Sequence, residues 1–524
     1  MGNCIKGEND DKINDSFFDA NSSMHTNMIR RMGRDVNRDY ETIRILGEGS
    51  IGAISLVRKR ESKVGGSAYN GSERNKLLRR GQAPSIVVDK SRKTTFAMKS
   101  IILSRVTPEY IDELRNEVEV LKSLDHPNIV RAYEVYEDKR NIYVVMEYCS
   151  GGDLHTRAPY TESEAAKIIG KTISALTYMH ERNIVHRDLK FENIMFESRH
   201  PNAEINLIDF GLSKKCKEKG EIMKEGYGTI YTMAPQVLTG AYSSKADLWS
   251  IGVITYMLIS GKRPFPSRNR KILMQQIFQV DYSFDSYTWN EASNESQDFI
   301  RALLVFSEED RMDGRQALSH KWLNQEFPLS ERVPDDKVMT DISEKLAQYS
   351  KEREFMKIAK MVVAHKSTND DIKELKKAFD AIDTANEGTI ELSEFVACMK
   401  KLNKFTDKEI KSLFSQIDSD NDGYINYTEF LAATLDTHGR IEEERLANAF
   451  DRLDSDDTGF ISEKNLREFL GKDYSDDKFK TFLKEADHDD DGKISFDDFL
   501  KAFRDDQHAQ LEDMRESISV SQVF

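Results

Sequence analysis

An acidic loop recurs at a nearly constant interval in the C-terminal part of the chain, and this repeat limits the possible folds more than any other feature. The loops begin at Asp383, Asp418, Asp454 and Asp487, with spacings of 35, 36 and 33 residues. A period of this size indicates duplicated supersecondary units, which bury their apolar faces against one another. We therefore predict an all-α region of four helix–loop–helix units in this part of the chain.

The second loop fulfils each requirement of an EF-hand calcium site. Carboxylates stand at its first, third and fifth positions, and a glycine at the sixth position permits the sharp turn. The seventh residue offers a backbone carbonyl, and the twelfth is a glutamate that can bind the ion through both oxygens. The predicted calcium ligands are Asp418, Asp420, Asp422, Tyr424 and Glu429.

The other three loops depart from this pattern in different ways. The fourth ends at Asp498, which is one methylene shorter than glutamate, and the third ends at Asn465, which has no carboxylate. The first keeps Glu394 at its last position but has Ala385 in place of the third ligand. We rank the second loop strongest, then the fourth, the third and the first, and a purely structural pairing role stays open for the first and third. The further candidate ligands are Asp487, Asp489, Asp491, Lys493 and Asp498 in the fourth loop, and Asp454, Asp456, Thr458 and Phe460 in the third.

A second set of motifs begins near residue 44. A glycine-rich segment there lets the backbone amides of a β-turn approach nucleotide phosphates without obstruction by side chains. An apolar strand then ends in Lys99, whose ammonium can reach the α- and β-phosphates. Glu117 lies in a helical stretch, where its carboxylate can hold Lys99 in place. The nucleotide-binding residues predicted from the glycine-rich segment are Leu46, Gly47, Glu48, Gly49, Ser50, Ile51, Gly52, Ala53 and Ile54.

Two further motifs contain the residues expected to carry out phosphate transfer. His186 to Asn193 match H-R-D-L-x-x-x-N, and Asp209 opens a D-F-G motif downstream. Phosphoryl transfer needs positioning and charge compensation from the protein rather than covalent chemistry. We expect Asp188 to orient the substrate hydroxyl and accept its proton, and Lys190 to neutralise the γ-phosphate. Asn193 and Asp209 are expected to hold Mg²⁺.

Taken in order, these motifs resemble the eukaryotic protein kinase family over residues 40 to about 323. The resemblance implies an α+β, bilobal fold with an antiparallel β N-lobe and a helical C-lobe, and it implies ATP as the phosphate donor. The matching positions are Met146, Glu147 and Cys149 for adenine, Asp153 for ribose, Lys190 for the serine/threonine class, Glu192 for a basic substrate residue and Asp247 for support of the catalytic loop.

Three departures from the kinase pattern bear on activity. Gln236 replaces the glutamate of A-P-E, so the ion pair with Arg311 is lost, although the amide oxygen can still accept a hydrogen bond. Removing the partner of a buried charge costs roughly 3–5 kcal/mol. Residues 228–233 lack the usual Pro-Tyr-Tyr, and the short stretch from Asp153 to Glu164 predicts a trimmed C-lobe helix. None of these changes affects a phosphate, metal or proton-transfer residue, so an active kinase is expected rather than a pseudokinase.

The N-terminus and the charge balance bear on location and partners. The start Met1-Gly2-Asn3-Cys4 resembles an N-myristoylation site, with Cys4 placed for palmitoylation, although Lys6 stands where Ser or Thr is usual. The alternative is an ordinary polar terminus.

A net charge of −15 argues against nucleic-acid binding, and four scattered cysteines suit a reducing compartment. The expected location is cytoplasmic, at a membrane surface.

The succession of kinase motifs, helical segment and four EF-hands resembles the calcium-dependent protein kinases of plants and protists. The resemblance implies a junction that blocks the active site without calcium and is withdrawn when the sensor closes on it. Two alternatives stay open: a membrane scaffold with a dead kinase domain, and a kinase tuned by phosphorylation in which calcium is only structural.

The predicted segments are a flexible N-terminus (1–39), the kinase domain (40–323, with an insert at about 60–93), the junction (324–368), the EF-hand domain (369–506) and a tail (507–524).

Overall fold

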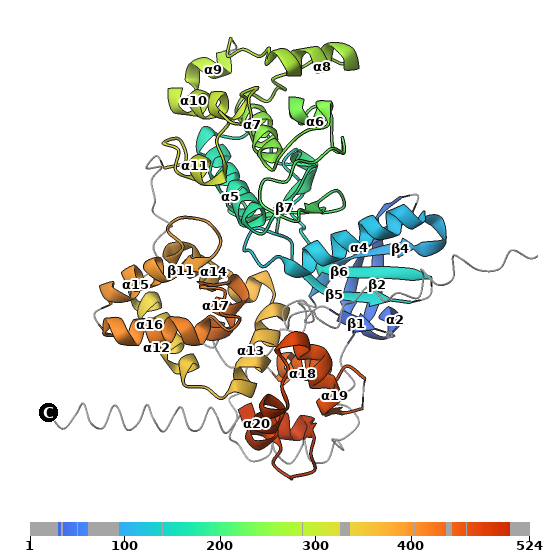
Figure 1. The fold of residues 1–524 in the computed structure, drawn as a ribbon, viewed down its shortest axis with the longest axis vertical. Helices are drawn as coiled ribbons and strands as arrows, with labels where there is room; N and C mark the ends of the chain where they lie inside the picture. The colour runs from blue at the N-terminus through green and yellow to red at the C-terminus, as the bar shows by residue number, and fades with distance from the viewer. Residues whose placement is uncertain are drawn as a thin grey trace, which may run out of the picture.

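A β-sheet lobe, a helical lobe and a second helical region follow one another along the chain (Figure 1). This order confirms the predicted fold class. No helix within the described residues has the length and apolar character of a membrane span. The computed structural model describes residues 30–32, 35–49, 51–60, 94–138, 140–285, 287–324, 336–402, 404–435, 443–456 and 458–503.

The N-lobe is a six-stranded sheet in the order β1-β5-β6-β4-β3-β2. The neighbours from β2 to β6 run antiparallel, as predicted. Helix α4 (Pro108–Ser123) packs on this sheet, because its buried Leu114 and Val118 share a core with Ile101 of β4. The strands are β1 (Arg30–Met32), β2 (Tyr40–Glu48), β3 (Gly52–Lys59), β4 (Thr95–Ile102), β5 (Ala132–Glu137) and β6 (Asn141–Glu147).

Part of the segment predicted to be flexible is ordered. Strand β1 pairs in parallel with β5, and a short helix, α2 (Val36–Asp39), follows it with a side-chain cap from Asp35. The polar composition misled the prediction because strand pairing at a sheet edge uses backbone groups, whatever the side chains are. Val36 is the one apolar residue of α2, and it is 3% exposed. From residue 61 on, the predicted insert at 60–93 lies outside the described residues.

The C-lobe is built around two long helices, α5 (Glu162–Glu181) and α7 (Lys245–Ser260). Thr161 and Glu164 form a capping box that starts α5. Helix α7 is mostly apolar, and its residues 246–259 are all buried, as expected for the central helix of a domain. Residues 153–161 form only turns, which confirms the trimmed helix. The other elements are β7 (Ile184–Val185), β8 (Ile194–Phe196), β9 (Ile205–Leu207), β10 (Lys214–Lys215), α6 (Pro235–Thr239), α8 (Arg270–Gln279), α9 (Tyr287–Glu291), α10 (Asn294–Leu303) and α11 (Gly314–Leu318).

Two helices, α12 (Asp336–Ser350) and α13 (Glu354–Lys366), occupy the junction. The helical segment predicted between the kinase motifs and the EF-hands is therefore present. Apolar side chains spaced three, four and six residues apart in the sequence are buried in it: Leu346, Tyr349, Phe355, Ile358, Ala359 and Val362. The chain breaks between them at residues 351–353, where the Arg353 guanidinium donates to the backbone oxygens of Glu485 and Ala502. Both helices contribute to one hydrophobic core with the EF-hand helices.

The EF-hand region forms two pairs of helix–loop–helix units. Loops one and two are joined by β11 (Ile390–Glu391) and β12 (Tyr424–Ile425), and loops three and four by β13 (Phe460–Ile461) and β14 (Ile494–Ser495). Helix α13 contacts α17 of the first pair and α18 and α20 of the second, so it lies between them. The helices are α14 (Asn369–Ile382), α15 (Leu392–Lys401), α16 (Asp407–Ile417), α17 (Tyr427–Thr434), α18 (Glu443–Leu453), α19 (Glu463–Leu470), α20 (Asp476–Ala486) and residues 496–503.

Candidate active site and calcium-binding loops

The glycine-rich segment forms the turn between β2 and β3. Gly47 pairs with Ile54 across the hairpin, and the Gly49 amide donates to the Gly52 carbonyl at 2.8 Å. A Cβ atom on Gly52 would lie 1.8 Å from the Ser100 carbonyl oxygen of β4, so this glycine is required by strand packing as well as by phosphate access. A Cβ on Gly47 would meet nothing within 4 Å. Ser50 lies outside the described residues.

The predicted pairing of Lys99 with Glu117 is present. The ammonium on β4 lies 2.6 Å and 2.7 Å from the two carboxylate oxygens on α4. The Glu117 side chain is only 7% exposed, which makes the ion pair stronger than one at the surface. This contact fixes the position of the lysine ammonium relative to α4.

Asp188 is held by three side chains. Its carboxylate accepts from Lys190 at 2.5 Å and from the Thr229 hydroxyl at 2.7 Å, and the Asn193 amide donates to its backbone oxygen at 2.8 Å. Burial acts to raise the pKa of Asp188, but the hydrogen bonds from Lys190 and Thr229 outweigh it and lower that pKa. Asp188 is therefore a carboxylate at neutral pH, as a proton acceptor must be. The sequence analysis did not assign the Thr229 contact.

Asp247 supports the catalytic loop from below, as predicted. Its two carboxylate oxygens accept from the backbone amides of His186 and Arg187, each at 2.9 Å. His180 adds a contact at 2.8 Å. Burial acts to raise the pKa of Asp247, but the interaction with His180 outweighs it, and the pKa lies below the ordinary value. The start of α7 is thereby tied to the loop that carries Asp188.

The D-F-G segment places the Asp209 carboxylate in the neighbourhood of Glu117. Asp209 has a positive φ of 63°, a conformation that is uncommon away from glycine and is found at functional sites. A Cβ atom on Gly211 would lie 3.3 Å from Asp209 Oδ1 and 3.7 Å from Glu117 Oε2, so Gly211 lies next to both carboxylates. Phe210 is buried, with its ring 5.3 Å from that of His186. With the amide oxygen of Asn193, this donor set fits Mg²⁺, which prefers oxygen ligands.

The predicted adenine and ribose residues lie at the end of β6 and just beyond it. The Glu147 amide donates to the Arg131 carbonyl, and the Glu147 side chain accepts from Asn206 at 2.9 Å and from Asn369 of the sensor. Asp153 accepts from the His155 amide and the Thr156 hydroxyl, each at 3.0 Å. The segment that would hold adenine is therefore in direct contact with the EF-hand region.

The activation segment, which runs from the D-F-G motif at 209–211 to residues 234–236, contains an ionic cluster that no sequence motif indicates. Arg187 lies 3.7 Å from the Glu225 carboxylate, and Lys214 lies 3.2 Å from Glu221 and 3.6 Å from Glu225. The Arg187 Nε donates to the Leu212 carbonyl at 2.5 Å. These contacts join the catalytic loop to Leu212, near the start of the segment, and to Glu225 further along it.

Gln236 accepts a hydrogen bond from Arg311 at 3.0 Å, as predicted. Arg311 is 1% exposed, and burial lowers its pKa to about 10. The backbone carbonyls of Lys245 and Val305 accept further bonds from the guanidinium, at 2.9 Å and 2.8 Å. The Gln236 amide donates to the Phe306 carbonyl. Loss of the ion pair is thus partly offset by neutral acceptors.

Loops two and four assemble carboxylate clusters. In each, three side chains offer oxygen atoms within 4.8 Å of one another: Asp418, Asp420 and Asp422 in loop two, and Asp487, Asp489 and Asp491 in loop four. Burial raises the pKa of Glu429, and burial followed by the nearby carboxylates raises that of Asp418. A bound divalent cation would relieve this repulsion, so both donor sets fit calcium.

Loop three has a different chemistry. The Asn465 amide nitrogen donates to Asp456 Oδ1 at 3.1 Å and to the Ser455 hydroxyl at 3.0 Å. Asn465 therefore acts as a donor in the position where an EF-hand needs an acceptor. Within the described residues, neither loop one nor loop three forms a cluster of three carboxylates.

The sensor contacts the kinase domain on the side of β5 and α5 (Figure 1). Arg131 donates to the backbone oxygens of Ala364, His365 and Ser367 at 3.2–3.5 Å, which caps the C-terminus of α13. Lys366 lies 2.8 Å from Glu134 of β5, and Lys171 of α5 lies 3.0 Å from Asp380 of α14. None of these kinase residues belongs to the catalytic loop.

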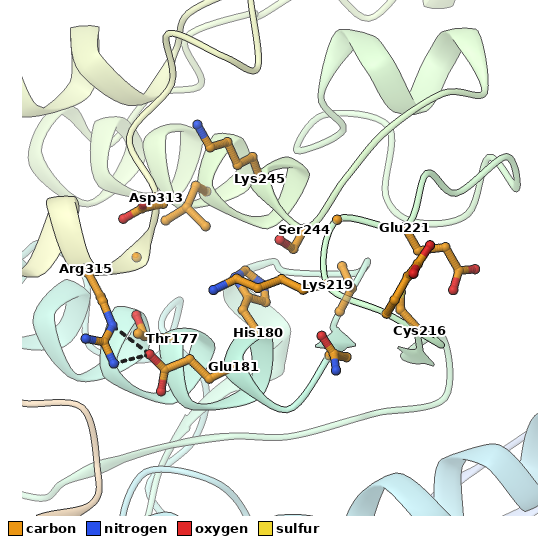
Figure 2. Close-up of a pocket in the computed structure, with 16 residues that line it drawn as sticks. Thr177, His180, Glu181, Cys216, Lys219, Glu221, Ser244, Lys245, Asp313 and Arg315 are labelled. Atoms are coloured by element: carbon orange, nitrogen blue, oxygen red, sulfur yellow. Dashed lines mark hydrogen bonds and ion pairs between the residues drawn. The ribbon is translucent and has the colours of Figure 1, made fainter. Parts of the chain in front are cut away.

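A cavity of about 130 Å³ lies at the C-terminal end of α5 (Figure 2), and none of the predicted phosphate-transfer residues lines it. Its lining includes His180, Cys216 and Lys219, as well as Glu181, which contacts Arg315. Cations and carboxylates are mixed along its wall.

Together the bilobal fold and the transfer site define a protein serine/threonine kinase that carries its own EF-hand sensor. The Protein kinase domain family matches residues 79–323, and the EF-hand domain pair family matches residues 372–435 and 443–504. The first of these matches starts at residue 79, whereas the sheet of the structure includes β2 and β3 upstream of it.

Comparison with known proteins narrows the class to one family. The chain is 34% identical to calcium-dependent protein kinase 5 of Plasmodium falciparum, over 81% of this chain and 76% of the relative. It is 33% identical to calcium-dependent protein kinase 4 of the same species, over 93% and 90%, and to calcium-dependent protein kinase 34 of Arabidopsis thaliana, over 82% and 83%. The chain belongs to the calcium-dependent protein kinase family. Its cofactors are ATP and Mg²⁺ in the kinase domain and Ca²⁺ in the EF-hands.

Proposed function

We propose that calcium switches the phosphotransferase activity by moving the junction helices between two sites. In the inhibited state the junction covers the active site, and in the active state the EF-hand pairs enclose it. The observation that carries this proposal is the burial of α13: Phe355, Met361 and Val362 are at most 4% exposed, in the core shared with both EF-hand pairs. The apolar side chains of α13 are thus buried inside the sensor and are not available to cover the active site, as the active state requires.

The site geometry supports specific roles in phosphate transfer. Lys99, fixed by Glu117, is placed to bind the α- and β-phosphates. Asp188 orients the substrate hydroxyl and takes its proton, and Lys190, which pairs with Asp188 here, would neutralise the γ-phosphate. Asn193 and Asp209 would hold Mg²⁺, which would supply charge neutralisation at the phosphate oxygens. The chain's own contribution is to hold these groups in position before the substrate arrives.

A basic substrate preference is part of the proposal. The Glu192 side chain is 48% exposed beside the catalytic loop, and its carboxylate lies 3.6 Å from His155 and accepts from the Tyr231 hydroxyl at 3.2 Å. A substrate arginine can pair with such a carboxylate through two hydrogen bonds. Peptides with arginine two or three residues before the serine should be phosphorylated with a lower KM than alanine versions, and Glu192→Ala should abolish the difference.

We further propose that acylation at Gly2 and Cys4 holds the enzyme at the cytoplasmic face of a membrane. Both residues lie outside the described part of the chain, and the support is the sequence motif. Two acyl chains give stable anchoring where one does not. Gly2→Ala should move the protein from the membrane to the soluble fraction of cells, and an unchanged distribution would contradict anchoring.

The test of the switch is phosphate transfer to a basic peptide with Mg-ATP, in calcium and in chelator. We expect activity in calcium only, and Glu429→Gln should shift the calcium requirement upward. Equal activity in both conditions would contradict the switch. If Glu429→Gln left calcium dependence untouched, calcium would be structural, and regulation would have to be sought in phosphorylation.

A further inference from the structure

The glycine turn of the first EF-hand loop is packed against the kinase domain, unlike the glycine turns of the other three loops. The sixth-position glycines of all four loops share a positive φ, between 78° and 89°. A Cβ atom on Gly388 of loop one would lie 1.9 Å from the ring of His126, a buried kinase residue. A Cβ on Gly423, Gly459 or Gly492 would meet nothing within 4 Å. Loop one is thus in direct contact with the catalytic domain at a point where the others are open.

The same loop directs a carboxylate at a kinase arginine. Glu387, at the fifth position, lies 2.9 Å from Arg315, and its side chain is 11% exposed. Arg315 also contacts Glu181, the last residue of α5, at 2.5 Å, and Figure 2 shows this second contact. The residue that would be a calcium ligand therefore already has a cation beside it.

The donor set of loop one does not fit calcium. Its third position is Ala385, which has no side-chain oxygen. Asp383 accepts from the amides of Glu387 and Gly388 at 3.0 Å and 2.7 Å, and Glu394 accepts from the Ala385 amide at 2.8 Å. Asp418 and Glu429 make similar bonds to backbone amides in loop two, so these bonds shape both loops. What separates loop one is the missing oxygen at its third position and the closer arginine beside its fifth.

We propose that the first EF-hand loop is a docking loop for the kinase domain, in which the Arg315 guanidinium takes the place of a calcium ion beside Glu387. The inference rests on the calcium-regulated function proposed above, and it identifies the part of the sensor that binds the catalytic domain. The loop binds the surface formed by His126, Glu181 and Arg315.

Loop two connects this docking surface to a calcium site. The two loops share the β11–β12 sheet, in which Ile390 pairs with Ile425. In loop two, Asp422 lies 3.8 Å from Arg182, and Asn426 accepts from Arg182 at 3.2 Å. Arg182 follows α5 directly, and the chain then passes through β7 to the catalytic loop. Loop two thus contacts Arg182, and loop one contacts Glu181 through Arg315, so both loops meet the end of α5. Arg182 is six residues before Asp188.

The first test is calcium stoichiometry in the full chain, measured by native mass spectrometry. Glu394→Gln removes the last carboxylate of loop one, and Glu429→Gln is the matched change in loop two. We expect Glu429→Gln to bind one calcium fewer and Glu394→Gln to bind as many as the wild type. Loss of one calcium in Glu394→Gln would overturn the proposal.

The second test is a double-mutant cycle on Arg315→Gln and Glu387→Gln, read in calcium by hydrogen exchange at the end of α5 and in loop one. Each single change should raise exchange about two- to fivefold, and the double change should raise it no further than one single change. Additive effects, or none, would overturn the proposal. Gly388→Ala should raise exchange at the end of α5 and in loop one, as the single changes do. Gly459→Ala, at a glycine with a similar positive φ, should leave exchange at α5 unchanged.

These readouts do not depend on phosphate transfer. If the kinase proved insensitive to calcium, the proposed switch would fail while the stoichiometry and the exchange cycle still decided whether loop one docks.

Discussion

Arg131→Ala tests how tightly the sensor is held on the kinase domain. The Arg131 Nη1 atom has two hydrogens and faces three carbonyl oxygens at the C-terminus of α13, at 3.2–3.5 Å. It therefore makes about two full hydrogen bonds. Bonds to a charged donor contribute about 1.5–3 kcal/mol each, and the long distances place these at the lower end. The loss of about 3 kcal/mol corresponds to about a hundredfold shift from docked to undocked sensor.

The assay is hydrogen exchange of residues 364–368 in calcium, together with the calcium concentration for half-maximal kinase activity. We expect faster exchange and a higher calcium requirement in Arg131→Ala. Arg131→Lys, which keeps the charge but not the planar donor geometry, should show a smaller effect in the same direction. Arg140→Ala removes an exposed arginine from the same lobe and serves as the control. If exchange and calcium requirement in Arg131→Ala matched the control, the capping argument would be wrong.

Four further changes test the active site and the calcium loops. Gly52→Ala should cost about 1–3 kcal/mol in thermal unfolding and raise the KM for ATP, because its Cβ meets a backbone oxygen, whereas Gly47→Ala should change unfolding by less than about 1 kcal/mol. Asp188→Asn should lower kcat by about 10²–10⁴ with an unchanged Tm, and a smaller loss would exclude it as the proton acceptor. Glu117→Gln should lower kcat/KM by about 10², since its lysine partner loses its fixed position. Asn465→Glu should add one bound calcium in native mass spectrometry, and Asn465→Gln should add none.

The sequence was sufficient wherever function depends on residues at fixed spacings. The Lys99–Glu117 pair, the support of the catalytic loop by Asp247 and the bond from Arg311 to Gln236 all lie where the motifs placed them. These motifs are short, and the chemistry fixes both residue type and position. The relative strength of the EF-hand loops could be argued in the same way, because each ligand position has its own requirement.

Contacts between distant segments could not be predicted in this way. Arg315 and Glu387 are 72 residues apart, and nothing in either local sequence indicates a partner. The pairing of Arg187 with Glu225 depends on the path of the activation segment, which motif spacing does not determine. Strand β1 could not be predicted from its side chains, because its pairing with β5 uses backbone groups. The junction, predicted as one helical segment, forms two helices, because tertiary contacts of Arg353 stabilise the break at 351–353.

The position of α13 inside the sensor means that the sensor carries a tethered ligand. Only residues 367 and 368 separate α13 from α14, so the two cannot drift apart on dilution. A short link of this kind gives an effective concentration in the millimolar range. A free peptide with the sequence of α13 would have to reach roughly millimolar concentration to displace it. Occupancy of the sensor by its helix is thus independent of protein concentration.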